Sequence, residues 1–397
     1  MISPTFRDML SRKSVIRELS EEATRLAADG RGEVFDFSLG SPSVPPPPEL
    51  KSVLQSLPDE IPESLLHGYS PTLGIPEVKQ AIADSLNRRF HMDYSAADIF
   101  PTSGAAAALA HAFRLVTVPG DEIVTFAPYF PEYGPYVAPT GCRLTVVEAD
   151  PVSYEINFEA LEKAMNPRVM ALLINTPNNP SGVMYREETL QNLASFLERK
   201  ERELGHELWL ISDEPYREIT FDGRQCPYVS RFWPRTLSCY SFSKSLSIPG
   251  ERIGYLAVNP ACGQSAMLVQ MCGQISRGIG HNCPTSMMQH LIARLIDRTS
   301  DLSVYETNMN LIYTALRDCG VQVTRPGGTF YIMPKLPGPD ANAACRRALE
   351  YRLVMVPCDT FGLPGHLRIA FCQSTGKVQR SLDALRAFFT REQDLNS

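Results

Sequence analysis

The sequence contains no apolar run long enough to span a membrane, and residues 1–7 (MISPTFR) lack the apolar core of a secretory signal. It also contains no basic stripe, because lysine and arginine are spread along a chain with a formal net charge of −6 and a pI of about 5.7. We therefore expect a cytoplasmic protein that binds neither nucleic acid nor an anionic membrane.

The ten cysteines include no CxxC pair, and no His/Cys spacing matches a zinc site. In a chain of this size without a signal, they are expected to be reduced and mostly buried thiols, and no bound metal is expected. The length of 397 residues and the apolar content of 44% are typical of a globular protein with two packed domains, or one large domain with an extension.

From about residue 98 the pattern alternates between short apolar runs and helical stretches. Continuous apolar runs are typical of strands buried on both faces, so they predict a mostly parallel sheet covered by helices, an α/β fold. Strands are expected at 122–127, 143–148, 169–174, 208–212, 237–240 and 253–258, with a helix at 187–203 among the connections.

The two ends of the chain have a different character. Residues 5–30 carry apolar side chains at helical spacing, and a proline-rich linker follows at 42–48. After Cys283 a long helical stretch runs towards Cys319, and then short strands (321–324, 329–333, 354–356, 367–371) and helices (340–351, 376–389) are expected. We predict a large domain at 47–285 and a smaller α+β domain formed by 1–46 and 286–397.

Four polar segments carry the chemistry. Ser241-Phe-Ser-Lys244 and Arg252 combine an amine, two hydroxyls and a fixed cation. A lysine that forms a Schiff base with a phosphorylated aldehyde needs such neighbours, since the hydroxyls and the guanidinium hold the phosphate. Taken alone, this run is better read as a surface loop, and the functional reading depends on the three segments that follow.

Two more segments directly follow predicted strands, where open α/β sheets bind ligands. The loop 175–182 (NTPNNPSG) contains prolines and asparagines that fix one conformation, although the same residues also form plain turns. Asp213 follows the next strand, and a carboxylate there is costly to bury unless it meets a cation. It could cap the next turn or pair with a pyridinium nitrogen.

The fourth segment, Thr102 to Ala106, leads into an alanine-rich helix. Small residues at a helix start expose backbone N–H groups, and the helix dipole favours an anion there. No GK[ST] follows, so the segment is not a Walker loop.

With these four segments in this order, the chain from Gly40 to Arg368 resembles the class I/II aminotransferases, the aspartate aminotransferase-like enzymes of fold type I that use pyridoxal 5′-phosphate. The resemblance implies a large domain with a mostly parallel seven-stranded sheet. It also implies that Lys244 is the Schiff-base lysine and proton carrier, and that Asp213 pairs with the pyridine nitrogen. Asn179 and Tyr216 match the donors to the phenolic oxygen of the cofactor, and Tyr133 is expected behind Asp213.

Other positions match the family's cofactor contacts. The phosphate is expected among Ser103, Gly104, Ala105, Ala106, Ser241, Ser243 and Arg252. Phe130 falls where the family stacks an aromatic ring on the cofactor, with Tyr129 as the competing choice. Tyr69, at the start of a Tyr-x4-Gly pattern, matches a residue that reaches the phosphate of the neighbouring subunit, which implies a homodimer with shared active sites.

For the substrate, Gly40 matches a loop whose backbone meets the α-carboxylate, and Arg368 matches the arginine that binds this carboxylate in a fork. Arg277, seven residues before Pro284, falls at the arginine with which the partner subunit of dicarboxylate-specific members binds a distal carboxylate. A helix-surface arginine is the equally weighted reading of Arg277.

The expected function is transfer of an amino group from an L-amino acid to a 2-oxo acid through a Lys244 aldimine, with aspartate and glutamate favoured. An aromatic or broad-specificity aminotransferase is one alternative. A carbon–sulfur β-lyase is another, because the cofactor residues do not determine which bond at the α-carbon breaks. A regulator that only senses the cofactor would need a DNA-binding module, for which the segment before Gly40 is too short.

Overall fold

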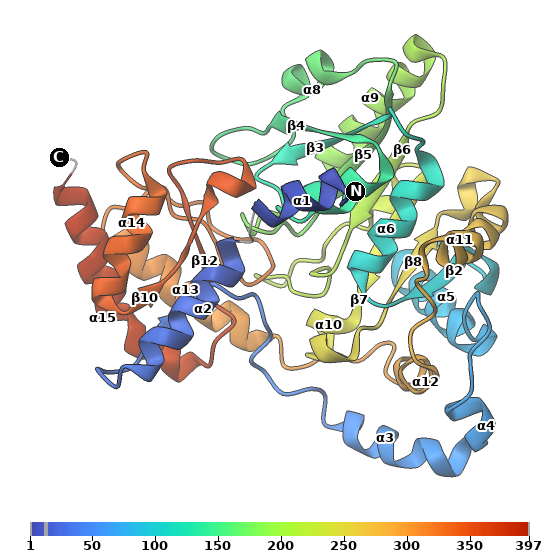
Figure 1. Ribbon diagram of the computed structural model, residues 1–397, viewed down its shortest axis with the longest axis horizontal. Helices are drawn as coiled ribbons and strands as arrows, with labels where there is room; N and C mark the ends of the chain where they lie inside the picture. The colour runs from blue at the N-terminus through green and yellow to red at the C-terminus, as the bar shows by residue number, and fades with distance from the viewer. Residues whose placement is uncertain (1, 12–14, 396–397) are drawn as a thin grey trace.

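The computed structural model describes residues 2–11 and 15–395 and is built around a seven-stranded sheet with the order β2-β8-β7-β6-β5-β3-β4 (Figure 1). All neighbouring pairs are parallel except those made by β8, which is antiparallel to β7 and β2. The strands are β2 (Ile99–Thr102), β3 (Glu122–Ala127), β4 (Arg143–Glu148), β5 (Val169–Asn175), β6 (Trp209–Asp213), β7 (Thr236–Ser241) and β8 (Gly254–Val258). The predicted α/β class and mostly parallel sheet are confirmed.

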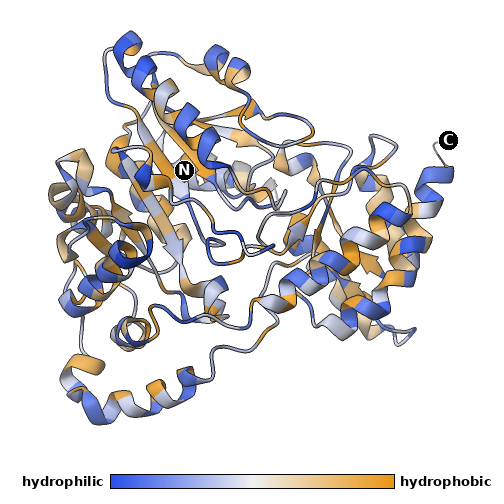
Figure 2. Ribbon diagram, turned by 180° about the vertical axis from the view of Figure 1, so that it is seen from behind, coloured by the Kyte–Doolittle hydropathy of each residue, from blue (hydrophilic) through white to orange (hydrophobic). Residues whose placement is uncertain are grey.

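The central strands form because their apolar runs are buried on both faces. Every residue of β3, β7 and β8 is buried, and orange, hydrophobic segments occur among the strands of this sheet in Figure 2. β3 and β4 have the predicted bounds, and β5 to β8 begin and end within one residue of theirs. The sequence did not predict β2, which lies at the edge of the sheet.

Helices cover both faces of this sheet. They are α3 (Glu49–Glu60), α4 (Glu63–Leu66), α5 (Pro76–Phe90), α6 (Ala105–Val116), α7 (Tyr133–Val137), α8 (Phe158–Ala164), α9 (Glu187–Leu204), α10 (Phe242–Ser245), α11 (Ser265–Ile279) and α12 (Ser286–Arg294). α6 packs on β6, β7 and β8 with its alanine and leucine face, and α11 packs on α6. The sheet therefore has a rigid helix behind the carboxyl ends of its central strands.

A second, smaller part lies beside the large sheet (Figure 1). It contains the antiparallel sheet β11-β12-β9 and the parallel pair β1-β10. Its elements are α2 (Val15–Ala28), β1 (Phe35–Asp36), α13 (Ser303–Asp318), β9 (Tyr331–Ile332), α14 (Ala341–Ala348), β10 (Leu353–Val354), β11 (Val356–Pro357), β12 (Leu367–Ala370) and α15 (Thr375–Asp394). Helix α1 (Pro4–Ser11) is not among them, because Figure 1 draws it over the large sheet.

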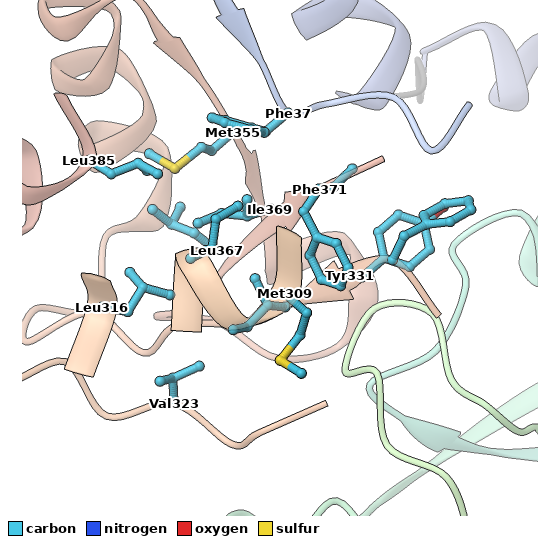
Figure 3. Close-up of a cluster of buried hydrophobic side chains, with 14 of the residues drawn as sticks. Phe37, Met309, Leu316, Val323, Tyr331, Met355, Leu367, Ile369, Phe371 and Leu385 are labelled. Atoms are coloured by element: carbon cyan, nitrogen blue, oxygen red, sulfur yellow. The ribbon is translucent and has the colours of Figure 1, made fainter. Parts of the chain in front are cut away.

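The core of this smaller part joins distant segments of the chain. Phe37 meets Met309 and Leu316 of α13, Ile369 of β12 and Leu385 of α15 in one buried cluster (Figure 3). Tyr216, which follows β6 of the large sheet, belongs to the same cluster. The two parts are thus packed together at the place where the large sheet presents its strand ends.

Three expectations for the ends of the chain were wrong in detail. The single helix predicted at 5–30 is two helices, α1 and α2, with residues 12–14 outside the described part. The long stretch towards Cys319 is also two helices, α12 and α13. The strand expected at 321–324 forms only an isolated bridge between Val323 and Pro334.

The division of the chain after residues 46 and 285 stays a prediction. α12 begins at Ser286 and packs on α3 and α5 of the large part, where Leu291 and Ile292 are fully buried. This packing favours a boundary nearer residue 300 than residue 285.

Candidate active site

A cavity of about 450 Å³ lies at the carboxyl ends of three parallel strands. Asn175, Asp213 and Ser241 are the last residues of β5, β6 and β7, and all three line it. The smaller part contributes Gly40, Tyr331 and Arg368 to its wall. The cavity is therefore placed where open α/β sheets bind ligands, and it is closed by the second part of the chain.

Lys244 lies in the short helix α10, directly after β7. Its Nζ donates a hydrogen bond of 2.6 Å to the carbonyl oxygen of Gly40. Burial lowers the pKa of Lys244 from 10.5 to about 8, and the positive charges of Arg252 and Arg368 act in the same direction, whereas the Cys372 thiol opposes them. A substantial fraction of the amine is therefore neutral, and nucleophilic, near pH 8.

Asp213 is buried at the end of β6. Its Oδ2 accepts a hydrogen bond of 2.7 Å from the Tyr133 hydroxyl, which confirms the expected position of Tyr133. Its Oδ1 is buried and has no hydrogen-bond partner among the described residues. Burial raises the pKa of Asp213 to about 7, although the Tyr133 hydrogen bond opposes this shift. A cationic N–H group that reached Oδ1 would satisfy the free oxygen and restore the carboxylate.

Asn179 and Tyr216 flank the cavity above Asp213. The backbone N–H of Asn179 donates to Asn175 Oδ1 at 2.7 Å, and Asn175 Nδ2 donates to the carbonyl of Asp213 at 2.8 Å. The Tyr216 hydroxyl lies 3.1 Å from the hydroxyl of Tyr331. These bonds fix the loop after β5 against the end of β6 and leave the Asn179 side chain facing the cavity wall.

A cluster of hydrogen-bond donors, which we call the cradle, lines another part of the cavity wall. Ala105 and Ala106 begin α6, whose first turn has no side-chain cap, and Ser241, Ser243 and Arg252 line the same part. Arg252 donates from Nη2 to the carbonyl of Ser103 at 3.2 Å. Gly104 has a φ of +87°, a backbone conformation that favours glycine. Backbone N–H groups, hydroxyls and a guanidinium in this arrangement suit a phosphate.

Arg368 is buried on β12 and faces the cavity from the smaller part. Its Nη1 donates to Asn179 Oδ1 at 3.2 Å, and its Nη2 donates to the carbonyl of Ser38. The guanidinium carbon lies 4.7 Å from the ring centroid of Tyr331 and 5.1 Å from that of Phe361. Two aromatic rings and two acceptors therefore hold a planar cation that can bind a carboxylate in a fork.

Most predicted site residues meet in this cavity, but not all. Phe130 lines it, whereas Tyr129 does not; Ser103 and Gly104 support it from behind. Tyr69 is fully exposed, and Arg277 lies exposed near the end of α11, so neither enters the cavity of its own chain.

The sequence did not indicate several other residues that line the cavity, and no local motif marks them. They are Ile16, Arg17, Leu109, Glu132, Tyr136, Pro215 and Pro249. Tyr331 lies in the segment 326–331 (PGGTFY), whose glycines mark a special backbone but not the role of its last residue. Its hydroxyl would lie 1.8 Å from a Cβ at position 40, which is why that loop requires Gly40.

Two other classes of site are absent from residues 2–11 and 15–395. No group of three or more His, Cys, Asp or Glu side chains is arranged to hold a metal ion. No helix in those ranges is long and apolar enough to cross a membrane.

Comparison with known proteins identifies the family. The family model described as aminotransferase class I and II matches residues 33–385. The aspartate aminotransferase of Thermotoga maritima is 28% identical over 379 residues, which cover 94% of this chain and 95% of that protein. The aromatic-amino-acid aminotransferase 2 of Thermococcus litoralis is 26% identical, over 90% of this chain and 92% of that one.

The solved structures agree with this result. An aminotransferase of Eubacterium rectale superposes with a TM-score of 0.95 at 38% identity and covers 99% of both chains. The structure of the Thermotoga maritima aspartate aminotransferase superposes with a TM-score of 0.86 at 27% identity and covers 100% of both chains. The chain belongs to the class I and II aminotransferase family, and it is an aminotransferase that uses pyridoxal phosphate.

Proposed function

We propose that Lys244 binds the cofactor and moves protons in the transfer of an amino group from an L-amino acid to a 2-oxo acid. The observation that carries this proposal is the common cavity of Lys244, Asp213 and Arg368. An amine with a lowered pKa, a buried carboxylate with one free oxygen and a forked cation face one space of about 450 Å³.

The residues present fit pyridoxal phosphate. The free Oδ1 of Asp213 can accept a hydrogen bond from a protonated ring nitrogen, and the cradle around Arg252 suits the phosphate. Asn179 and Tyr216 would donate to the phenolic oxygen of the cofactor, and Phe130 would contact its ring, since all three line the cavity. When bound, the cofactor supplies an electron-withdrawing ring that stabilises negative charge at the substrate α-carbon.

Lys244 then acts as the base of the reaction. Its amine takes the proton from the substrate α-carbon and returns it on the cofactor side, which requires a pKa near the working pH. Arg368 holds the α-carboxylate, and the nearby backbone of Gly40 approaches the same group. The Asp213 carboxylate, which the Tyr133 hydroxyl orients, would hold the proton on the ring nitrogen of the bound cofactor.

We further propose a homodimer in which each active site takes residues from both chains. Tyr69 supports this proposal because its side chain is fully exposed in one chain and packs against nothing there. Arg277 is likewise outside the cavity of its own chain, so it can bind substrate only from a partner. Amino acid and 2-oxo acid substrates enter each site from the rim.

As substrates we propose amino acids with a second carboxylate, aspartate and glutamate. The names of several relatives, among them the aspartate aminotransferases of Thermotoga maritima and Geobacillus stearothermophilus, support this class. The Thermococcus litoralis relative, named for aromatic amino acids, keeps the aromatic alternative open. A carbon–sulfur β-lyase would use the same cofactor residues.

A half-reaction screen tests the proposal. The holoenzyme is mixed with single amino acids, and the absorbance of the lysine-bound cofactor is followed as it converts to the pyridoxamine form. Aspartate and glutamate should convert it fastest. Release of pyruvate and ammonia from cystathionine, without amino transfer to 2-oxoglutarate, would instead identify a β-lyase.

A further inference from the structure

Helix α2, from the start of the chain, reaches the rim of the active-site cavity. Ile16 and Arg17, in its first turn, both line the cavity. Ile16 packs against a buried cluster that includes Phe361, and the Phe361 ring lies 5.1 Å from the guanidinium carbon of Arg368. The same apolar cluster therefore positions the first turn of α2 and supports the arginine proposed to hold the α-carboxylate.

Six charged side chains line the cavity, and the proposed function uses four of them. Lys244, Arg252, Asp213 and Arg368 are assigned to the cofactor and the α-carboxylate. Arg17 and Glu132 remain, and neither is assigned a role in the proposed function. The rim thus carries one cation and one anion that no part of the mechanism uses.

The charge of Arg17 acts across the rim on Tyr136, another lining residue that the mechanism does not use. Burial raises the pKa of Tyr136 to about 12, and the charge of Glu132 acts in the same direction, whereas the charges of Arg252 and Arg17 oppose it. Arg17 is itself exposed on the first turn of α2. The guanidinium therefore lies within electrostatic range of the interior of the site.

We propose that Arg17 binds the distal carboxylate of a dicarboxylic substrate in the active site of its own chain. Arg17 lines the same cavity as Arg368 and Lys244, so one dicarboxylic substrate can meet all three side chains there. A guanidinium suits this task because its planar donors bind both oxygens of a carboxylate. This inference rests on the proposed function and names the group that selects the substrate.

The rim also contains Glu132, a side chain of the opposite charge that would favour a different class of substrate. Glu132 would repel a distal carboxylate and attract a distal ammonium group, so the two side chains favour opposite substrates. Because Arg17 is exposed, whereas Glu132 is partly buried at the start of α7, we assign the selection to Arg17.

The test compares two arginines of one helix. Arg17→Met removes the proposed ligand. Arg25→Met is the matched control, since Arg25 lies two turns further along α2, pairs with Glu22 at 2.7 Å and does not line the cavity. Both variants are prepared as holoenzymes, and retention of the cofactor absorbance band establishes that the site has formed.

Two measurements distinguish a loss of selectivity for dicarboxylic substrates from a general loss of activity. The first is kcat/KM for aspartate and glutamate against alanine and phenylalanine. The second is the Kd of the unreactive dicarboxylate succinate against the monocarboxylate butyrate. For Arg17→Met we expect a loss of about tenfold to hundredfold for aspartate, glutamate and succinate, and less than about twofold for the other three ligands. Arg17→Lys should recover part of the loss.

Three results would overturn the inference. They are an equal loss for all substrates, a loss of the same size in Arg25→Met, and a selective loss in Arg277→Met with Arg17→Met unaffected. In each case wild-type turnover of amino acids would leave the proposed function in place. A wild-type holoenzyme that transfers no amino group from any amino acid would overturn the proposed function itself.

Discussion

Lys244 Nζ and the carbonyl oxygen of Gly40 are joined by a hydrogen bond of 2.6 Å between residues 204 positions apart in the sequence. Gly40 belongs to the loop that leaves the smaller part, and Lys244 follows β7 of the large sheet. The bond therefore connects the two parts of the chain at the reactive amine. It also keeps the amine beside the backbone that is proposed to meet the substrate carboxylate.

Replacement of this amine should abolish the reaction. Lys244→Ala removes both the group that binds the cofactor covalently and the base that moves the proton, so we expect kcat to fall by at least about a thousandfold. Borohydride treatment followed by peptide mass analysis should find the cofactor on Lys244 in the wild type. The exposed Lys335→Ala is the control and should retain activity. Label on another lysine would contradict the assignment.

The pH dependence of cofactor loading follows from the pKa of the same amine. Burial lowers this pKa to about 8, so the neutral, nucleophilic fraction increases as the pH rises through 8 and is nearly complete by pH 9. The rate at which the cofactor-free protein regains the lysine-bound absorbance band should rise between pH 7 and 9 and then level off. A rate that still increases from pH 9 to 10.5 would indicate an unshifted lysine.

Asp213 should make the cofactor-free protein less stable at high pH. Burial raises the pKa of Asp213 from 3.8 to about 7, so the folded state binds more protons than the unfolded state between these values. Stability from this group is fully present below pH 3.8 and is lost as the pH rises through 7. Asp213→Asn removes the buried charge and should raise the free energy of unfolding at pH 8 by about 2–4 kcal/mol.

Denaturant unfolding of the cofactor-free variant and wild type at pH 5 and pH 8 measures this effect. The gain should be smaller at pH 5, where the wild-type carboxyl is largely protonated. Asp383→Asn, at a fully exposed carboxylate, should change neither value by more than about 0.5 kcal/mol.

The same Asp213→Asn variant should gain less stability from pyridoxal phosphate than the wild type, because the buried partner of the ring nitrogen is gone. An equal gain would contradict that pairing.

The central strands could be predicted from the sequence because burial on both faces produces continuous apolar runs. β3 and β4 were predicted to the residue for this reason. β2 was not, since Pro101 interrupts its four residues and proline excludes a central strand. At the edge of the sheet, where β2 pairs only with β8, the missing N–H is tolerated.

The cofactor end of the site was predictable for a related reason. Asn179, Asp213 and Lys244 lie at or just after the ends of the successive strands β5, β6 and β7, and parallel strands bring their carboxyl ends together. Arg17 carries no such signal. It reaches the rim because Ile16 packs against the buried cluster that includes Phe361, which lies 345 positions further along the chain, and no local pattern encodes this packing.

A mixture of two impaired variants tests whether the active site is shared between chains. Tyr69→Ala should weaken the site of the partner chain, and Lys244→Ala should inactivate the site of its own chain. In a mixed dimer one site carries both lesions, whereas the other site has Lys244 from one chain and Tyr69 from its partner. Activity should therefore return when the two variants are unfolded and refolded together, and a sedimentation experiment should find dimers in every sample. Subunits that act independently would regain no activity, because every chain would keep its own lesion.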